Sequence, residues 1–255
     1  MSQQLPGIVD RVELTEVLVV VPARNEERLL PRCLQALQDA ADRLAAERPG
    51  VAVRVVVVLD RCSDGSAEIV AGWPGVVVVV SDHGRVGTAR ALGVDHGLGV
   101  SPVPPPGVWI GSTDADSAVP PDWLLTQLRY ADEGVDLVLG TVRPDPAELS
   151  DPVVRRWLNR HDLADGHPHV HAANLGVRAD IYRAVGGFAG VDVHEDVFLA
   201  AAVRGAGGRV VSTGASPVLT SARVTGRTPG GMAGYLSDLA ESDDPRWELT
   251  FGRVG

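Results

Sequence analysis

The clearest pattern along the chain is a set of short β-branched runs separated by segments with helical periodicity. The runs cover residues 17–22, 53–60, 75–81 and 108–114. Their apolar character is continuous rather than alternating, which is typical of strands buried on both faces. We therefore expect four buried strands in the first half of the chain.

Helical segments fill the intervals between these strands. One helix face is formed by residues spaced i, i+3, i+4 and i+7, namely Leu30, Cys33, Leu34 and Leu37. Residues 84–98 open with glycines and continue as a second helix. This alternation predicts an α/β fold with a right-handed, doubly wound, mostly parallel central sheet flanked by helices. Ligands of such sheets bind beyond the carboxyl ends of the strands.

The pattern loosens in the second half of the chain. We expect a helix at about 122–132, a strand at 136–142, a helix near 195–204 and a strand at 209–213. The proline-rich segment 101–107 predicts a surface loop. The tail from residue 226 is glycine-rich and then acidic, which predicts a mobile tail or lid over 226–255.

Composition narrows the classes of partner. The net charge of −10 over 255 residues disfavours binding to nucleic acid, which requires clustered Lys and Arg, so we expect no nucleic-acid partner. Two cysteines suit a reducing compartment rather than a disulfide framework. With no long apolar stretch and no signal-peptide pattern, we expect a cytoplasmic protein without a transmembrane segment, and a homodimer is compatible with this.

Polar residues follow all four expected strands of the first half. They are Asn25 and Glu26, then Asp60, then Arg85 and Arg90, and then Asp114 and Asp116. Taken singly, each has a plain structural explanation, because Asp favours the turn after a strand and arginine is common on solvated helices. Together they would lie at one edge of one sheet, which favours a ligand site.

These residue types suit transfer from a nucleotide-diphosphate donor. A carboxylate near the first two strands can accept hydrogen bonds from the N–H groups of a base, and an arginine can reach the diphosphate. Closely spaced carboxylates can hold Mg²⁺ or Mn²⁺, which neutralises charge on a departing diphosphate. An acidic protein could bind an anionic donor in this way.

Six segments, in this order and spacing, resemble a family 2 glycosyltransferase with the GT-A fold, of the inverting, soluble, non-processive type. They are VVVPARNEERLLPRCLQAL, VVVVLDRCSDGS, GTARALGV, DADSAVPPDWL, AANLGVRADIYRAVGGF and HEDVFLAAAVRGAGGRV, and the match runs from about residue 16 to 213. The resemblance implies a metal-dependent enzyme that moves a sugar from a UDP- or GDP-sugar, with Mn²⁺ or Mg²⁺, to an unidentified hydroxyl acceptor. The Q-x-x-R-W motif of polysaccharide synthases is absent, so a polymerising synthase is not expected.

The resemblance also implies residue roles. On the donor side, the nucleoside is lined by Pro22, Ala23, Asn25 and Glu26, the base is read by Asp60, the diphosphate is met by Arg90, and the D-x-D motif is Asp114, Ala115 and Asp116. Both aspartates of that motif are metal-associated, and Asp116 is the stronger candidate for a direct ligand. On the acceptor side, Asp196 is the general base with Glu195 beside it, and Asn174 and Gly176 lie near the donor sugar and the acceptor.

Under this resemblance the domain organisation is a single GT-A domain over 1–255 with a smaller acceptor-side subregion. The nucleotide-sugar-binding half covers 16–117 and the acceptor-binding half covers 118–225. Helix N-terminal charge is the plain alternative for Glu195 and Asp196. Four histidines remain open between acceptor contact, a zinc site and a polar loop, namely His161, His167, His169 and His171.

Two other functions stay open. A sugar nucleotidyltransferase has a related sheet, but it would ordinarily carry a glycine-rich signature with a lysine after the first strand, and residues 17–27 contain neither. A non-catalytic nucleotide-sugar sensor would bind donor without turnover. The residues expected to contact the base differ from the pattern of the resembled family, because Arg61 stands where that family usually has a second acid. Retention or inversion at the anomeric carbon also remains open.

Overall fold

A computed structural model of the chain describes residues 12–161 and 163–223; the expected tail over 226–255 lies outside the described residues. The described chain falls into two compact units. The larger contains residues 12–143 and 163–220, and the smaller contains 144–161 and 221–223. In the described part, no helix is long and apolar enough to cross a membrane.

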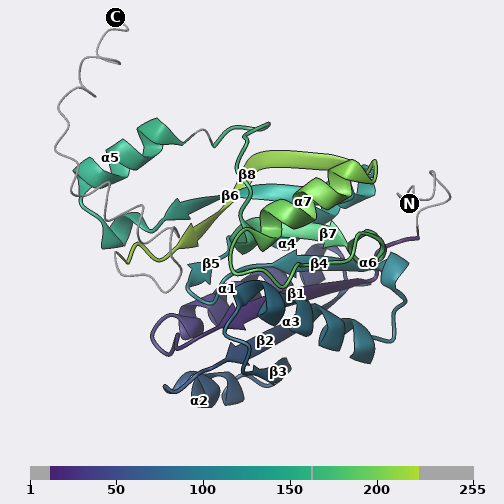
Figure 1. Ribbon diagram of the computed structural model, residues 1–255, viewed down its shortest axis with the longest axis horizontal. Coiled ribbons are helices and arrows are strands. Elements are labelled where there is room, and N and C mark those ends of the chain that lie inside the picture. The colour runs from purple at the N-terminus through teal and green to yellow at the C-terminus, as the bar shows by residue number, and fades with distance from the viewer. Residues whose placement is uncertain (1–11, 162, 224–255) are drawn as a thin grey trace, which may run out of the picture. The chain divides into compact units, whose positions relative to one another are not determined.

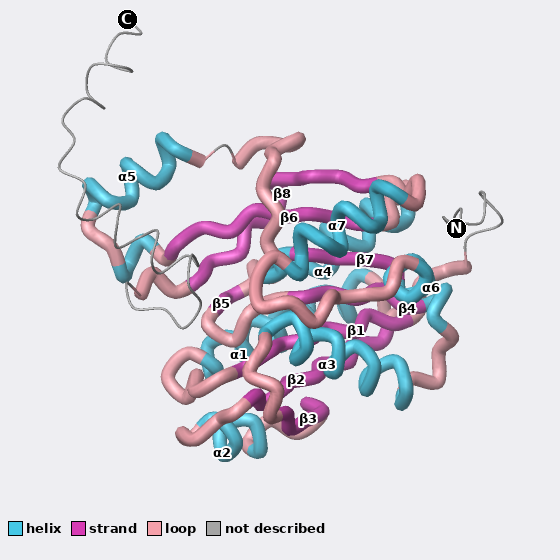
Figure 2. Tube along the Cα trace, viewed as in Figure 1, coloured by secondary structure: helices cyan, strands magenta, loops and turns pink. Residues whose placement is uncertain are grey.

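The first half of the larger unit alternates strands and helices (Figures 1 and 2). The elements are β1 (Glu16–Ala23), α1 (Leu30–Glu47), β2 (Ala52–Asp60), α2 (Ser66–Ala71), β3 (Val76–Ser81), α3 (Val86–Val100), the 3-10 helix η1 (Pro105–Gly107) and β4 (Val108–Ser112). β1 pairs in parallel with β2 and β4, and β2 pairs in parallel with β3. All four expected strands are therefore confirmed, and η1 is the one regular turn within the expected proline-rich loop.

The second half completes an eight-stranded sheet of order β3-β2-β1-β4-β7-β6-β8-β5. Its elements are β5 (Ser117–Ala118), α4 (Trp123–Asp132), β6 (Leu137–Pro144), η3 (Ala172–Asn174), β7 (Leu175–Arg178), α6 (Ala179–Ala184), α7 (Glu195–Gly205) and β8 (Val210–Thr220). The pairs β4–β7, β6–β7 and β5–β8 are antiparallel. The α/β fold with a helix-flanked sheet is confirmed, and the parallel strands form one side of it.

Two strands differ from expectation. β7 was not anticipated, because only four residues form it and one of them is Gly176. That glycine is a packing requirement, since a Cβ there would lie 2.7 Å from Trp109 Nε1. β8 was expected to end at residue 213 but continues to Thr220, because its second part mixes polar and apolar positions with a proline.

The smaller unit contains the 3-10 helix η2 (Pro146–Glu148) and the helix α5 (Asp151–Arg160). Helix α5 was not anticipated because only Val153 and Trp157 are buried along it, which leaves no broad apolar stripe in the sequence. The ring of Trp157 stacks on His161 with centroids 4.2 Å apart.

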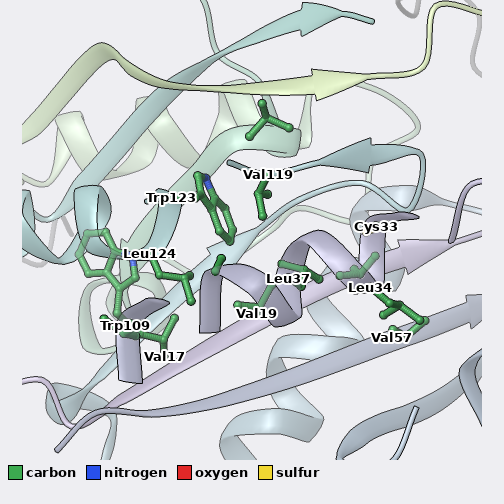
Figure 3. Close-up of a cluster of buried hydrophobic side chains, with 14 of the residues drawn as sticks. Val17, Val19, Cys33, Leu34, Leu37, Val57, Trp109, Val119, Trp123 and Leu124 are labelled. Carbon is green, nitrogen blue, oxygen red and sulfur yellow. The ribbon is translucent and has the colours of Figure 1, made fainter. Parts of the chain in front are cut away.

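The core of the larger unit lies on both faces of the sheet. Alternate residues of β1 point to opposite faces, so Val17 and Val19 pack with α1 and α4, whereas Leu18 packs with α3, α6 and α7. Figure 3 shows the first face, where Leu34 and Leu37 of α1 lie over the strands. This double burial explains the continuous apolar runs, and it leaves the strand ends as the places where polar side chains gather.

Candidate active site

The loops that follow β1 and β2 are tied together. Asn25 adopts a left-handed conformation with φ of 53°, and its Oδ1 accepts a hydrogen bond of 2.7 Å from Ser63 N. Cys62 Sγ donates to the carbonyl of Ala23 at 3.3 Å. Since Ala23 and Pro22 are the last residues of β1, the ends of the two neighbouring strands form one connected polar rim.

Asp60 ends β2 and is 4% exposed. Its Oδ1 accepts three hydrogen bonds, from Ser81 Oγ at 2.9 Å and from the backbone N–H groups of His83 and Gly84 at 3.0 Å. No described residue donates a hydrogen bond to its Oδ2. One oxygen of Asp60 therefore fixes the loop after β3, and the other remains available to a ligand.

Arg90 lies on α3 and is 3% exposed. One Nη donates to Glu195 and the other to Asp114, and the guanidinium lies 6.0 Å from the ring centroid of Phe188. Burial alone would lower the pKa of Arg90, but the charges of Asp114 and then Glu195 outweigh burial and raise it. Arg90 is thus a permanent cation that holds two carboxylates, and the predicted contact with diphosphate stays a prediction.

The D-x-D segment forms the turn between β4 and β5. Asp114 points one oxygen at Arg90, and its carbonyl accepts a hydrogen bond of 3.0 Å from Ser117 N. Asp116 Oδ1 accepts from Ser117 Oγ at 3.4 Å and from Thr220 Oγ1 at 3.3 Å. The intervening Ala115 is buried, so the turn directs two carboxylates away from the core.

Glu26 belongs to the same neighbourhood as the D-x-D carboxylates. The thiol of Cys33 on α1 has its pKa raised, first by burial and then by the negative charges of Asp116, Asp114 and Glu26. Cys33 also donates to the carbonyl of Asp114 at 3.4 Å. Cys33, on the predicted face of this helix, is a core residue and lies directly beneath the D-x-D turn.

Helix α7 brings the E-D pair to this edge. Its N-cap, His194, is left-handed with φ of 67°, which turns the chain sharply into the helix. Glu195 is buried against Arg90, and burial raises its pKa despite the attraction of that arginine. Asp196 Oδ2 accepts a hydrogen bond of 2.8 Å from the backbone N–H of Ala172, and Oδ1 accepts one of 2.8 Å from Val197 N. Asp196 is therefore held in one orientation.

Asn174 is the predicted site residue that is most fully engaged within the fold. Its Oδ1 accepts from Trp123 Nε1 at 2.8 Å, and its Nδ2 donates to the carbonyls of Thr141 at 2.8 Å and Ser216 at 2.9 Å. The side chain is buried. The structure thus uses the Asn174 side chain to join α4, β6 and β8, and only its backbone is available to line a site.

The donor set fits a divalent cation in part. Mg²⁺ is commonly held by one or two carboxylates together with phosphate oxygens of the substrate and water. Asp114 and Asp116 supply two carboxylates on one turn. Within residues 12–161 and 163–223, no group of three or more His, Cys, Asp or Glu side chains is placed to hold a metal. A cation here would therefore take its remaining ligands from the donor.

The histidine-bearing segment forms a stacked column rather than a cluster of ligands. The rings of His167 and His169 have centroids 5.7 Å apart, and those of His169 and His171 are 5.8 Å apart. His161 belongs to the other compact unit. Because the described residues contain no group of three metal-binding side chains, the zinc alternative is not supported.

Four predicted residues lie in one neighbourhood, namely Arg90, Asp114, Glu195 and Asp196. Asp60 and Asn25 lie at the ends of β2 and β1, the neighbouring parallel strands. Partners that the sequence did not predict include Phe188 against Arg90 and Thr220 against Asp116. Neither carries a local sequence signal, because both contacts join segments far apart in the chain.

Comparison with known proteins gives one match to a family and many matches to solved structures. A sequence model described as "Glycosyl transferase family 2" matches residues 18–183, which is more than half of the chain. No curated protein sequence matches the chain.

The similar structures have low sequence identity. S. aureus TarS 1-349 in complex with UDP is 16% identical with a TM-score of 0.58, covering 82% of this chain and 61% of that one. The mannosyltransferase PcManGT from Pyrobaculum calidifontis, in complex with GDP-Man and Mn²⁺, is 22% identical with a TM-score of 0.59, covering 84% and 59%. M. tuberculosis glucosyl-3-phosphoglycerate synthase is 17% identical with a TM-score of 0.52, covering 88% and 77%. These likenesses show the fold, and the chain spans about three fifths of the first and second structures.

Proposed function

Since the chain belongs to glycosyl transferase family 2, we propose that it moves a sugar from a nucleotide-diphosphate sugar to a hydroxyl group of an acceptor, with inversion at the anomeric carbon. Family membership favours this reaction over the sugar nucleotidyltransferase that the sequence left open. UDP and GDP-Man in the TarS and PcManGT structures support a donor of this class.

The observation that carries the proposal is the placement of Arg90 between Asp114 and Glu195. One carboxylate belongs to the D-x-D turn after β4, and the other belongs to the E-D pair that opens α7. The arginine joins these two motifs, so groups for the leaving diphosphate and for the incoming acceptor meet at one edge of the sheet.

The residues then have separate roles. The rim formed by Pro22, Ala23, Asn25 and Glu26, with Asp60, binds the nucleoside. Asp196 takes the proton from the acceptor hydroxyl while the acceptor oxygen attacks the anomeric carbon from the side opposite the diphosphate. Its hydrogen bond from Ala172 N fixes the carboxylate in advance, which favours proton transfer in one geometry. Glu195, beside Asp196 in the catalytic pair, orients Arg90 through their ion pair.

Asp116 and Asp114 would hold Mg²⁺ or Mn²⁺ together with oxygens of the donor. When bound, the cation supplies Lewis-acid stabilisation of the negative charge on the diphosphate. Arg90 forms an ion pair with Asp114 and so adds positive charge to the same region. This positive charge limits the repulsion between the acidic site and an anionic donor.

A turnover assay tests this function. Release of nucleoside diphosphate is measured from a panel of UDP- and GDP-sugars with and without Mn²⁺, using simple glycosides and phosphorylated alcohols as acceptors. Asp196→Asn should lower kcat by about 100-fold or more while donor binding persists, because it removes the base and keeps the shape of the side chain. Asp116→Asn should remove the metal-dependent part of donor binding.

The matched control is Asp95→Asn, which changes an exposed carboxylate on α3 that accepts no hydrogen bond from the described residues. It should leave turnover unchanged. Donor binding without turnover for every acceptor, with equal behaviour of wild type and Asp196→Asn, would instead indicate the non-catalytic sensor.

A further inference from the structure

We propose that two copies of this chain join edge to edge through β3, with the two β3 strands antiparallel and related by a two-fold axis. β3 is the last strand at one end of the sheet and pairs with β2 alone (Figure 2). The inference rests on two features of the same residues, the side chains and the peptide groups of Val78 and Val80. It does not depend on the proposed glycosyl transfer.

The first feature is a pair of exposed apolar side chains. Successive residues of a strand point to opposite faces of the sheet. Val77 and Val79 pack on the face of α3, and Val76 packs on the face of α1. Val78 and Val80 continue the row of Val76, but they are 43% and 78% exposed. Two neighbouring valines of one row therefore form an apolar strip on the outermost strand.

The second feature is a set of outward peptide groups. Within a strand, the N–H and C=O of one residue point to the same side, and those of the next residue point to the other side. The carbonyl of Ser81 accepts a hydrogen bond of 3.0 Å from Arg61 N, so Ser81 and Val79 direct their peptide groups toward β2. Val78 and Val80 direct theirs away from β2, where no described residue bonds to them.

The edge lacks the usual protection against pairing. Edge strands commonly carry a lysine, a proline or a bulge, which prevents another strand from adding to the sheet. β3 has the sequence VVVVVS, with neither a charged residue nor a proline. An apolar edge of this kind pairs with a further strand if one of matching shape and charge is present.

A second β3 matches in register and in charge. Antiparallel pairing that places Val78 opposite the partner's Val80 uses the outward peptide groups of both residues, and each such pair exchanges two N–H···O bonds. Val79 then lies on the two-fold axis, and Asp82 lies opposite the partner's Val76. No like charges face each other in this register. The valine strips of the two copies also meet on one face, which removes apolar surface from water.

The helices leave room for this arrangement. α3 lies over β1 and β2, since a Cβ at Gly93 would touch Val20 and Val58 of these two strands. The α3 helices of two joined copies would be separated by about four strand spacings of about 4.8 Å, roughly 19 Å in all. Packed helices need only about 8–10 Å between their axes. The two copies of α3 therefore do not collide.

Sedimentation velocity and hydrogen exchange of the full chain test the proposal. The average mass should rise from monomer toward dimer between about 1 and 200 µM, because association follows mass action. Over the same range, the amides of Val78 and Val80 should become more protected from exchange. The amide of Val79 is the internal control, since it points to β2 and should be protected at every concentration.

The other results overturn the proposal. Protection of Val78 and Val80 that does not change with concentration would mean that a segment of the same chain covers the edge. A monomer with both amides unprotected throughout would mean that the edge stays bare. Dimerisation without added protection at these amides would place the interface elsewhere.

Three variants locate the interface. Val80→Lys puts a charge beside the partner's Val78, so it should weaken dimerisation by about 10-fold or more with little change in melting temperature. Val100→Lys, at a 50% exposed position at the end of α3, is the matched control and should leave dimerisation unchanged.

Val80→Pro removes only an outward N–H, which edge strands tolerate, and it should also abolish the dimer. If Val80→Pro fails to fold, the comparison of Val80→Lys with Val100→Lys decides. A dimer of unchanged affinity in Val80→Lys would exclude β3 as the interface.

Discussion

Arg90 and Glu195 form a buried ion pair between α3 and α7, 105 residues apart in the sequence. Both helices lie on the same face of the sheet. Arg90→Met should destabilise the protein by about 3–5 kcal/mol, because it leaves the buried carboxylate of Glu195 without its counter-ion. Urea unfolding of wild type and variant measures this difference.

The matched double variant, Arg90→Met with Glu195→Leu, should recover most of the lost stability, since replacing a whole buried pair by apolar side chains is often close to neutral. Asp114 needs no replacement there, because its side chain is 36% exposed and can be hydrated. A single variant that costs less than about 1 kcal/mol, the range of surface pairs, would show that the pair is not buried in solution.

Close packing of α3 on the sheet gives a second prediction. A Cβ at Gly93 would lie 2.6 Å from Val20 Cγ1 and 2.8 Å from Val58 Cγ2. Gly93→Ala should therefore destabilise the protein by about 1–3 kcal/mol through overpacking. On the same helix, a Cβ at Gly99 meets nothing within 4 Å, so Gly99→Ala should be neutral or stabilising by up to about 1 kcal/mol. Equal effects in urea unfolding would contradict the packing of α3.

Asn174 should matter for stability more than its polar character suggests. Asn174→Ala removes the hydrogen bonds that this side chain makes with Trp123 Nε1, Thr141 O and Ser216 O. We expect a loss of at least about 2 kcal/mol in the free energy of unfolding. Asn159→Ala, at an exposed position of α5, should stay within about 0.5 kcal/mol. A similar small effect for Asn174 would argue against the three bonds.

Acid stability should depend on Asp165. Hydrogen bonds from Gly214 N and then Thr213 Oγ1, each 2.9 Å long, lower the pKa of Asp165. Because the pKa is lowered in the folded state, the unfolded chain binds the proton more readily than the folded protein. The charged Asp165 therefore contributes to stability above about pH 3.9. This contribution is lost as the pH falls through the folded-state pKa.

Wild type should therefore exceed Asp165→Asn in stability at pH 6, and the difference should shrink below about pH 4. Thermal unfolding of both proteins across this pH range measures it. Asp95→Asn should show no comparable trend, as Asp95 accepts no hydrogen bond from the described residues. A difference that is constant with pH would mean that the two bonds do not distinguish the charged carboxylate from the neutral amide.

The sequence alone predicted the parallel part of the sheet well, for a physical reason. Strands buried on both faces need long apolar runs, and β1 has one over 17–23 and β2 has one over 55–59. β7 and the later part of β8 were not predicted, because neither contains such a run. β7 has four residues including a glycine, and β8 has mixed burial.

The candidate site was predictable only in outline. The carboxyl ends of parallel strands must meet at one edge, so Asp60 and Asp114 could be grouped from the strand pattern. The pairing of Arg90 with Glu195 could not be, because no periodicity links residues in separate helices across a stretch of 105 residues. The sequence also could not predict that only Oδ1 of Asp60 accepts hydrogen bonds from the loop after β3, because this depends on the path of that loop.

The long sequence separation within the Arg90 cluster also orders events during synthesis. Arg90 and Asp114 are 24 residues apart and can leave the ribosome together, whereas Glu195 emerges much later. Domains begin to fold from the N-terminal side as the chain grows. The parallel strands can therefore associate while Arg90 still lacks one of its two carboxylates. Arrival of α7 then completes both the charge balance and the proposed active site in one late step.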